Sequence, residues 1–183
     1  MCSALVSREK NKVIFVDTES SFSVERLKQI APDYKKLLER ITVFRPGSFI
    51  EQQKVISEFR KLETENLGLI IVDTVVTLYR VERGKSDNYE LNTELGLQIS
   101  FLSEIARKKN IPIILTSQVY SPMNSTEEIK MVGGDLLNYA SKCLIELQNL
   151  RGMRRLILRK HRSLPTDAME FKIVDKGIVK VKS

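Results

Sequence analysis

Short apolar runs alternate with helical spacings along most of the chain. Four runs, at 13–16, 41–44, 67–72 and 111–115, have the length of strands, and three of them stop at carboxylate or hydroxyl side chains. The branched apolar runs are typical of strands buried on both faces of a parallel sheet. Helical spacings lie between them, so the order predicts a parallel sheet joined by right-handed strand–helix crossovers.

The helices that should cover this sheet begin at recognisable caps. Ser23 can cap a helix that Pro32 ends, a capping box at 48–51 opens the next helix, and the acidic pair at 87–90 starts a third. The residues expected to face the core are Val24, Leu27 and Ile30, then Val55, Phe59 and Leu62, then Leu91, Leu95, Ile99, Leu102 and Ala106. Residues 75–88 are predicted to be a charged connection.

The last third of the chain has a different pattern. A polar connection at 119–131 and a short helix near 135–141 lead into strand-like segments separated by glycine turns. These segments predict two antiparallel hairpins, with turns at 151–152 and 175–177. The expected fold class is therefore α/β, with a mainly parallel sheet flanked by helices and antiparallel hairpins at the carboxy terminus.

Composition is that of an ordinary globular protein, and residues 1–183 fit a single domain. Hydrophobic residues make up 42% and charged residues 29% of the chain. No apolar stretch reaches the roughly 18 residues of a spanning helix, and the amino terminus lacks the regions of a signal peptide. We therefore expect a cytoplasmic protein without a membrane partner. Its two cysteines have no metal-ligand spacing.

The formal charge is +7, and basic residues concentrate on the first predicted hairpin. Its cluster is Arg151, Arg154, Arg155, Arg159, Lys160 and Arg162. Such density suits contacts to phosphates, which give salt-sensitive affinity without sequence readout. We therefore predict nonspecific binding to single- or double-stranded DNA, with a solvated basic strand pair as the alternative.

Polar groups follow three of the predicted strands. They are 17–19, with Glu19; 73–74, with Asp73 and Thr74; and 116–118, with Gln118. Ligands of open parallel sheets bind beyond the carboxyl ends of the strands, and a carboxylate there can hold Mg²⁺ beside nucleotide phosphates. The alternatives are that Asp73 only caps the next turn and that Glu19 is a surface residue.

These strand ends, with the segments 19–27, 133–140 and 160–165, resemble the RecA/RadA recombinase superfamily over essentially the whole chain. Within it, the chain is most similar to the short archaeal RadA paralogues that lack the amino-terminal domain. The resemblance implies a RecA-like core that uses ATP and Mg²⁺. It implies that Glu19 is the general base and that Asp73, with Thr74, is the Walker B group that positions Mg²⁺.

The resemblance also assigns roles outside the carboxylates. Gln118 matches the residue that senses the terminal phosphate, and Leu164 with Pro165 matches the segment that covers the nucleotide of a neighbouring subunit. The connection with Arg80 and Arg83 matches the first DNA-binding loop, and 119–131 matches the second.

The phosphate loop of the family is absent from these residues. Its pattern is Gly-x-x-x-x-Gly-Lys-Ser/Thr between a strand and a helix. The lone Gly84-Lys85-Ser86 follows the Asp73 strand and has Tyr79 where the first glycine belongs. From the resemblance we expect the natural gene product to begin roughly 40 residues upstream, the length of a strand, loop and helix. A short form that has lost ATP binding is the alternative. ATP and Mg²⁺ are expected only with the loop restored.

The function implied is that of an accessory recombination factor. We expect it to bind DNA, to hydrolyse ATP weakly in its complete form, and to lack full strand exchange. The expected partners are the RadA recombinase, a Holliday-junction resolvase and further copies of the chain. The alternatives are another RecA-fold ATPase, KaiC-like or helicase-like, and a nucleotide-independent module that docks on a recombinase.

Overall fold

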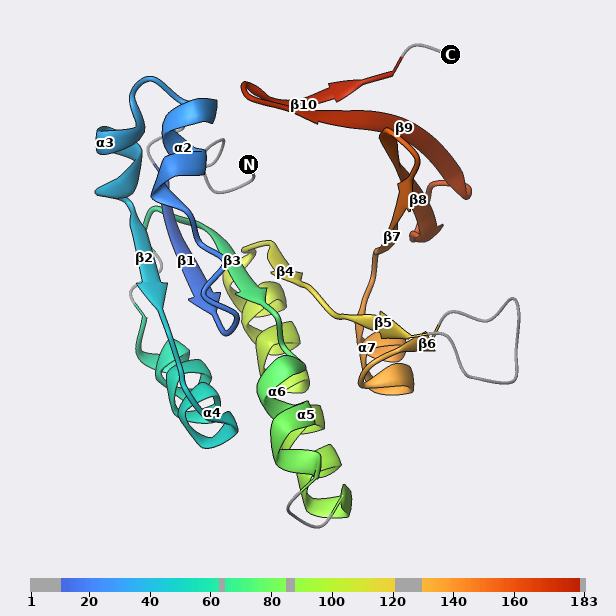
Figure 1. Cartoon of the computed structure of the whole chain (residues 1–183). Helices are drawn as coiled ribbons and strands as arrows, with labels where there is room; N and C mark the ends of the chain where they lie inside the picture. Colours follow the sequence, from blue (N-terminus) through green and yellow to red (C-terminus); the bar gives the residue numbers. More distant parts are fainter. Residues whose placement is uncertain (1–10, 63–64, 85–87, 121–129, 182–183) are drawn as a thin grey trace.

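The structure is a computed structural model, and it describes residues 11–62, 65–84, 88–120 and 130–181. Two sheets stand apart in it and are connected through a small hairpin and a short helix (Figure 1). The helical end expected within 1–12 and the Gly84-Lys85-Ser86 tripeptide lie largely outside the described residues. So does most of the connection at 119–131.

The first sheet is parallel, with the strand order β2-β1-β3-β4. Its strands are β1 (Lys12–Asp17), β2 (Ile41–Phe44), β3 (Leu67–Asp73) and β4 (Ile113–Leu115). Val16 pairs with Val72 and Asp17 with Asp73, so the carboxyl ends of β1 and β3 lie level with one another. The predicted parallel sheet is confirmed.

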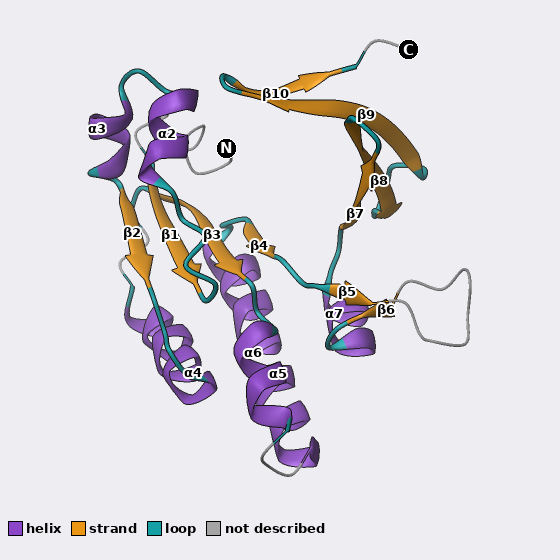
Figure 2. Ribbon diagram, in the orientation of Figure 1, coloured by secondary structure: helices purple, strands orange, loops and turns teal. Residues whose placement is uncertain are grey.

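The helices surround this sheet much as the sequence predicts (Figure 2). They are α2 (Val24–Ile30), α3 (Tyr34–Leu38), α4 (Phe49–Glu58) with the 3₁₀ turn η1 (Phe59–Lys61), α5 (Thr77–Arg83), α6 (Asn88–Lys109) and α7 (Gly134–Ala140). The main core joins residues of β1 and β3 to α4, α5, α6 and α7, and it includes the fully buried Val72 and Leu95. Val13, Leu69 and Ile71 pack on the other face of the sheet.

Several local predictions are wrong. Residues 75–88, predicted to be a charged connection, contain the helix α5, which buries Tyr79. Strand β4 is half-buried, because it is the edge of the parallel sheet in the described chain. Val24 is exposed on α2, and in α6 Ile105 is buried whereas Ala106 is only half-buried.

The cap at the start of α4 also differs in detail. Ser48 accepts a hydrogen bond from the backbone N–H of Glu51, as predicted. The Glu51 carboxylate accepts from the N–H of Gly47 at 2.7 Å, one residue earlier than in a capping box. Both side chains therefore cap the helix start, as the sequence predicts, but Glu51 accepts from the N–H of Gly47 instead of that of Ser48.

The second sheet is antiparallel, with the order β10-β9-β8-β7. It contains β7 (Leu144–Leu150), β8 (Met153–Lys160), β9 (Asp167–Val174) and β10 (Gly177–Lys180). Both predicted hairpins are confirmed. The short strands β5 (Val119–Tyr120) and β6 (Lys130–Met131) pair between the two sheets. No helix among the described residues is long and apolar enough to cross a membrane.

Arg26 connects α2 to the β9–β10 turn of the second sheet, and Figure 1 shows α2 beside that turn. Its guanidinium donates to the carbonyl oxygens of Val174 at 2.7 Å, Asp175 at 3.2 Å and Gly177 at 3.3 Å. These three charge-assisted hydrogen bonds fix the β9–β10 turn against α2.

Candidate functional site

The three predicted strand ends meet at one edge of the parallel sheet. After β4, the Thr116 hydroxyl donates to Oδ1 of Asp73 at 2.6 Å. After β1, the Ser21 hydroxyl donates to Oδ2 of the same carboxylate at 2.8 Å. Gln118 donates from Nε2 to Oε1 of Glu19 at 2.8 Å. Glu19, Asp73 and Gln118, which are far apart in sequence, therefore belong to one cluster.

Asp17, the first of the strand-end carboxylates, has a structural role. It is 1% exposed and accepts from the backbone N–H groups of Ser21 at 2.8 Å and Phe22 at 3.1 Å. The Arg45 guanidinium lies 3.5 Å from its Oδ2 atom. These bonds hold the turn that carries Glu19, so Asp17 shapes the site without facing it.

Thr74, and not Asp73, caps the turn that follows β3. Its hydroxyl accepts from the backbone N–H of Thr77 at 3.1 Å. Its own backbone N–H and C=O both bond the Thr18 hydroxyl at 2.9 Å, across to the end of β1. Asp73 is thereby left half-buried with its carboxylate turned toward the hydroxyls of Ser21 and Thr116.

Glu19 is tied to α5 as well as to Gln118. The Thr77 hydroxyl donates to its Oε1 atom at 2.5 Å. Arg80, one turn further along α5, donates to Oε1 of Gln118. No local pattern in the sequence marks Thr77, because its contact with Glu19 exists only once residues 77–83 form a helix.

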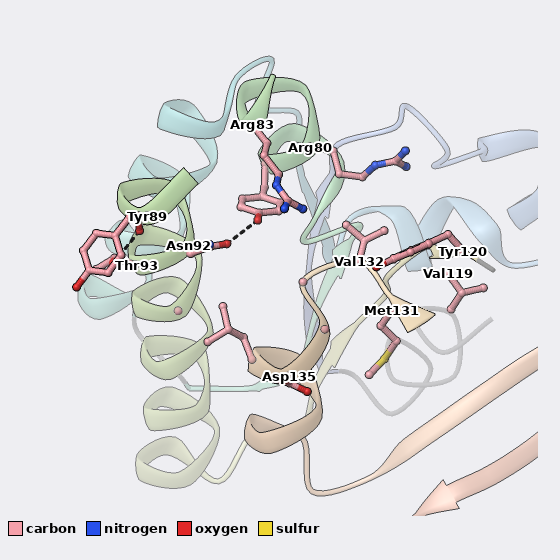
Figure 3. A pocket seen from close by; sticks show the side chains of 15 residues that line it. Arg80, Arg83, Tyr89, Asn92, Thr93, Val119, Tyr120, Met131, Val132 and Asp135 are labelled. Atoms are coloured by element: carbon pink, nitrogen blue, oxygen red, sulfur yellow. Dashed lines mark hydrogen bonds between the residues drawn. The ribbon is translucent and has the colours of Figure 1, made fainter. Parts of the chain in front are cut away.

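Beside this cluster lies a groove of about 800 Å³ between α5, α6, the β5–β6 hairpin and α7 (Figure 3). Arg80, Arg83, Tyr89, Asn92 and Tyr120 are among its lining residues. Figure 3 shows Arg83 directed into the space between α6 and the β5–β6 hairpin. The side chain of Arg80 extends away from Arg83 and passes above Val132 and Tyr120 in this view. The two arginines that the resemblance assigned to a DNA-binding loop thus share one cavity.

The groove contains a fixed amide at its α6 wall. The hydroxyl of Tyr79 donates to Oδ1 of Asn92 at 2.6 Å, which leaves the Asn92 amide N–H₂ available to a ligand. Arg83 donates from Nε to Oδ1 of Asn88 at 3.3 Å. Positive charge, an amide donor and tyrosine rings together suit a ligand with phosphates and aromatic bases.

The basic cluster on β8 is less open than its sequence suggests. Arg155 pairs with Glu170 on β9 at 2.8 Å, and Arg159 pairs with Glu146 on β7 at 2.6 Å. The hydrogen bond from Arg159 holds the pKa of the Glu146 carboxyl below its ordinary value. Lys160 donates to the carbonyl oxygen of Asn138 at 2.7 Å. Within the described chain, Arg151, Arg154 and Arg162 are the members of the cluster whose side chains make no hydrogen bond or ion pair.

Leu164 and Pro165 lie in the turn between β8 and β9, in the second sheet and apart from the Asp73 cluster (Figure 1). They are exposed and line a pocket of about 350 Å³ together with Arg159, Lys160 and His161. The His161 ring accepts at Nδ1 from the backbone N–H groups of Ser163 and Leu164, which shapes this turn. Their role toward a neighbouring subunit stays a prediction.

The carboxylates fit a hydrated Mg²⁺ better than a directly bound ion. No group of three or more metal-ligating side chains occurs among the described residues. Mg²⁺ usually keeps several waters and takes one or two carboxylates plus substrate phosphates, which Asp73 and Glu19 match. The glycine-rich amides that would surround the phosphates are not among these 183 residues. These residues therefore supply only the carboxylate side of a nucleotide site.

Comparison with known proteins gives one consistent result. A profile of the Rad51 family matches residues 5–181. The DNA repair and recombination protein RadB of Methanocaldococcus jannaschii is 41% identical over 170 residues, which are 91% of this chain and 79% of that protein. RadB of Methanobrevibacter smithii is 38% identical over 183 residues, covering 95% and 77%. The crystal structure of the RadB recombinase superposes with a TM-score of 0.82 and 32% identity, covering 99% of this chain and 84% of the other.

Proposed function

The chain belongs to the Rad51 family, among its RadB-like DNA repair and recombination proteins, and from this premise we propose that it binds DNA without sequence preference through the groove beside α5. The observation that carries the proposal is the shared cavity of Arg80, Arg83 and Tyr120, about 800 Å³ in volume. The predicted recombinase relationship and RecA-like fold are confirmed. DNA binding and its residues remain part of the proposal.

The groove has the chemistry of a phosphate path. Both arginines are bonded to neutral amide oxygens, of Gln118 and Asn88, so their positive charge is not cancelled. Tyr89 and Tyr120 offer exposed rings at its walls, 78% and 52% accessible. Arginines contact the backbone of any sequence, and aromatic rings stack on any base. Affinity without sequence readout follows.

The test is the binding of a labelled single-stranded oligonucleotide and its duplex by fluorescence anisotropy over a series of salt concentrations. Arg83→Ala should weaken binding and should lower the slope of log affinity against log salt by about 0.7 to 0.9, the contribution of one lost phosphate contact. Arg107→Ala is the control, because Arg107 is exposed at the other end of α6. Equal slopes for the two variants would remove Arg83 from the DNA site.

ATP and Mg²⁺ enter the proposal only for a chain that carries the phosphate loop. Asp73 would hold the hydrated ion, Thr74 would keep the turn after β3 in place, and Glu19 would orient a water, the chemistry that ATP hydrolysis requires. Isothermal titration with Mg²⁺ and ATP, run on this chain and on a chain extended through the loop, checks it. We expect heat of binding from the extended chain only.

Family membership also supports partners of the recombinase type. We propose that the chain assists a RadA recombinase, and the contact with a Holliday-junction resolvase and self-assembly belong to the same proposal. Sedimentation of the chain alone and mixed with each partner tests them separately. A sedimentation coefficient unchanged by any mixture would leave DNA binding as the sole proposed interaction.

A further inference from the structure

Three side-chain hydrogen bonds and one turn of α5 form a closed ring that joins the carboxylate cluster to the groove. Thr77 and Arg80 lie one turn apart on α5. Thr77 bonds Glu19, Glu19 bonds Gln118, and Gln118 bonds Arg80. Glu19 follows β1 and Gln118 follows β4, so the ring spans three separate segments.

The direction of the hydroxyl protons in this ring is determined by chemistry. The backbone N–H of Thr77 can only donate, so the Thr74 hydroxyl accepts it at 3.1 Å. A carboxylate can only accept, so the Thr77 hydroxyl gives its single proton to Glu19. The Thr74 hydroxyl must then donate to Thr77 across their 2.7 Å contact. The Thr74 hydroxyl therefore points toward Thr77, and the Thr77 hydroxyl points toward Oε1 of Glu19.

The orientation passes on to Gln118. Oε1 of Glu19 accepts the Gln118 amide N–H₂ at 2.8 Å, so the amide oxygen of Gln118 must face the opposite way, toward Arg80. A guanidinium has five N–H donors, and this bond uses one of them. Arg80 keeps its full charge and its remaining donors for a phosphate while its long side chain is held in place.

We propose that Thr77 is a positioning residue for DNA binding. It holds Glu19, Glu19 orients the Gln118 amide, and Gln118 holds Arg80 at the groove. The inference rests on the proposed function of the groove and adds to it a residue that need not touch DNA. An immobilised flexible side chain is worth a factor of about 2 to 10 in affinity. Loss of the Thr77 hydroxyl should therefore weaken DNA binding by that factor.

The experiment measures oligonucleotide affinity for Thr77→Val, Thr77→Ser, Arg80→Ala and the double variant Thr77→Val/Arg80→Ala. We expect Thr77→Val to weaken binding. Thr77→Ser, which keeps the hydroxyl, should bind with the affinity of the wild type. In the Arg80→Ala background Thr77→Val should have no further effect, because the side chain that Thr77 positions is gone. Ser103→Ala is the control, since the Ser103 hydroxyl donates to the carbonyl of Ile99 in its own helix α6 and Ser103 is not among the residues that line the groove.

The outcomes separate the two proposals. Weaker binding by Arg80→Ala with unchanged binding by Thr77→Val overturns the positioning role and leaves the groove in place. Additive losses in the double variant overturn it as well. Unchanged binding by Arg80→Ala overturns the role of Arg80 in the groove and, with it, that of Thr77. If thermal melting shows that Thr77→Val unfolds, Gln118→Met replaces it in the experiment. This substitution removes the bonds of the half-buried Gln118 to Glu19 and Arg80, and its affinities alone and with Arg80→Ala are compared in the same way.

Discussion

The groove beside α5 and the β7–β8 hairpin both collect arginines, but these arginines have different partners. In the groove, Arg80 and Arg83 donate to the neutral amides of Gln118 and Asn88. On the hairpin, Arg155 and Arg159 donate to the carboxylates of Glu170 and Glu146. A neutral acceptor orients a guanidinium and leaves its charge, whereas a carboxylate orients it and cancels the charge.

The comparison teaches that the density of basic residues in a sequence does not measure the field available to a polyanion. The hairpin carries six basic residues between 151 and 162, more than the groove contributes. Two of them are balanced by cross-strand carboxylates, and a third, Lys160, bonds a carbonyl. Four of the six therefore keep an uncancelled charge, so the count of basic residues in the sequence overstates the positive field of the hairpin.

The largest effect should distinguish the arginines with neutral partners from the arginines with carboxylate partners. Arg80→Ala/Arg83→Ala should weaken oligonucleotide binding at low salt about tenfold or more, because two oriented phosphate contacts are lost. Arg155→Ala/Arg159→Ala, with the same change in formal charge, should alter it about twofold or less. Anisotropy titrations of both variants in one buffer give the ratio. A hairpin variant that loses more affinity than the groove variant would reverse the comparison.

A smaller effect should follow from removing the carboxylates of the hairpin. Glu146→Gln/Glu170→Gln keeps the side-chain shapes and frees the charge of Arg159 and Arg155. Oligonucleotide affinity should rise about two- to fivefold and become more salt-dependent, since two more cations can face phosphates. Glu58→Gln is the control, because its ion pair with Lys61 joins the end of α4 to η1 and neither residue lines the groove or belongs to the hairpin. Affinity unchanged by the double variant would mean that the hairpin does not face DNA.

The smallest effect concerns acid stability. Because Arg159 holds the pKa of Glu146 below its value in the unfolded chain, about 4.3, this pair stabilises the fold above that pH. The contribution is lost as pH falls through the lowered folded pKa. Wild type should exceed Glu146→Gln by about 0.5 to 1 kcal/mol in free energy of unfolding near pH 6, and the difference should shrink below pH 4. Urea unfolding at the two pH values measures it, and a constant difference would contradict the ion pair.

Local patterns predicted the parallel sheet well. Runs such as 67–72 are apolar at every position except the glycine, so both faces of β3 had to be buried. The glycine turns at 151–152 and 175–177 predicted the two hairpins for an equally local reason. The helix α5 was not predicted, because its seven residues, Thr77–Arg83, are too few to show a helical period and include the β-branched Thr77 and Val81. Its formation depends on burying Tyr79 and on the Thr74 cap.

By itself, the sequence determined which segments become strands, where Glu19, Asp73 and Gln118 follow them, and how many cations the chain carries. These features depend on residues a few positions apart. Only the tertiary structure decided that Thr77 reaches Glu19, that Gln118 reaches Arg80, and that Glu146 and Glu170 neutralise Arg159 and Arg155. Those contacts depend on strand order and register, which set the neighbours of each side chain across gaps that no local periodicity encodes.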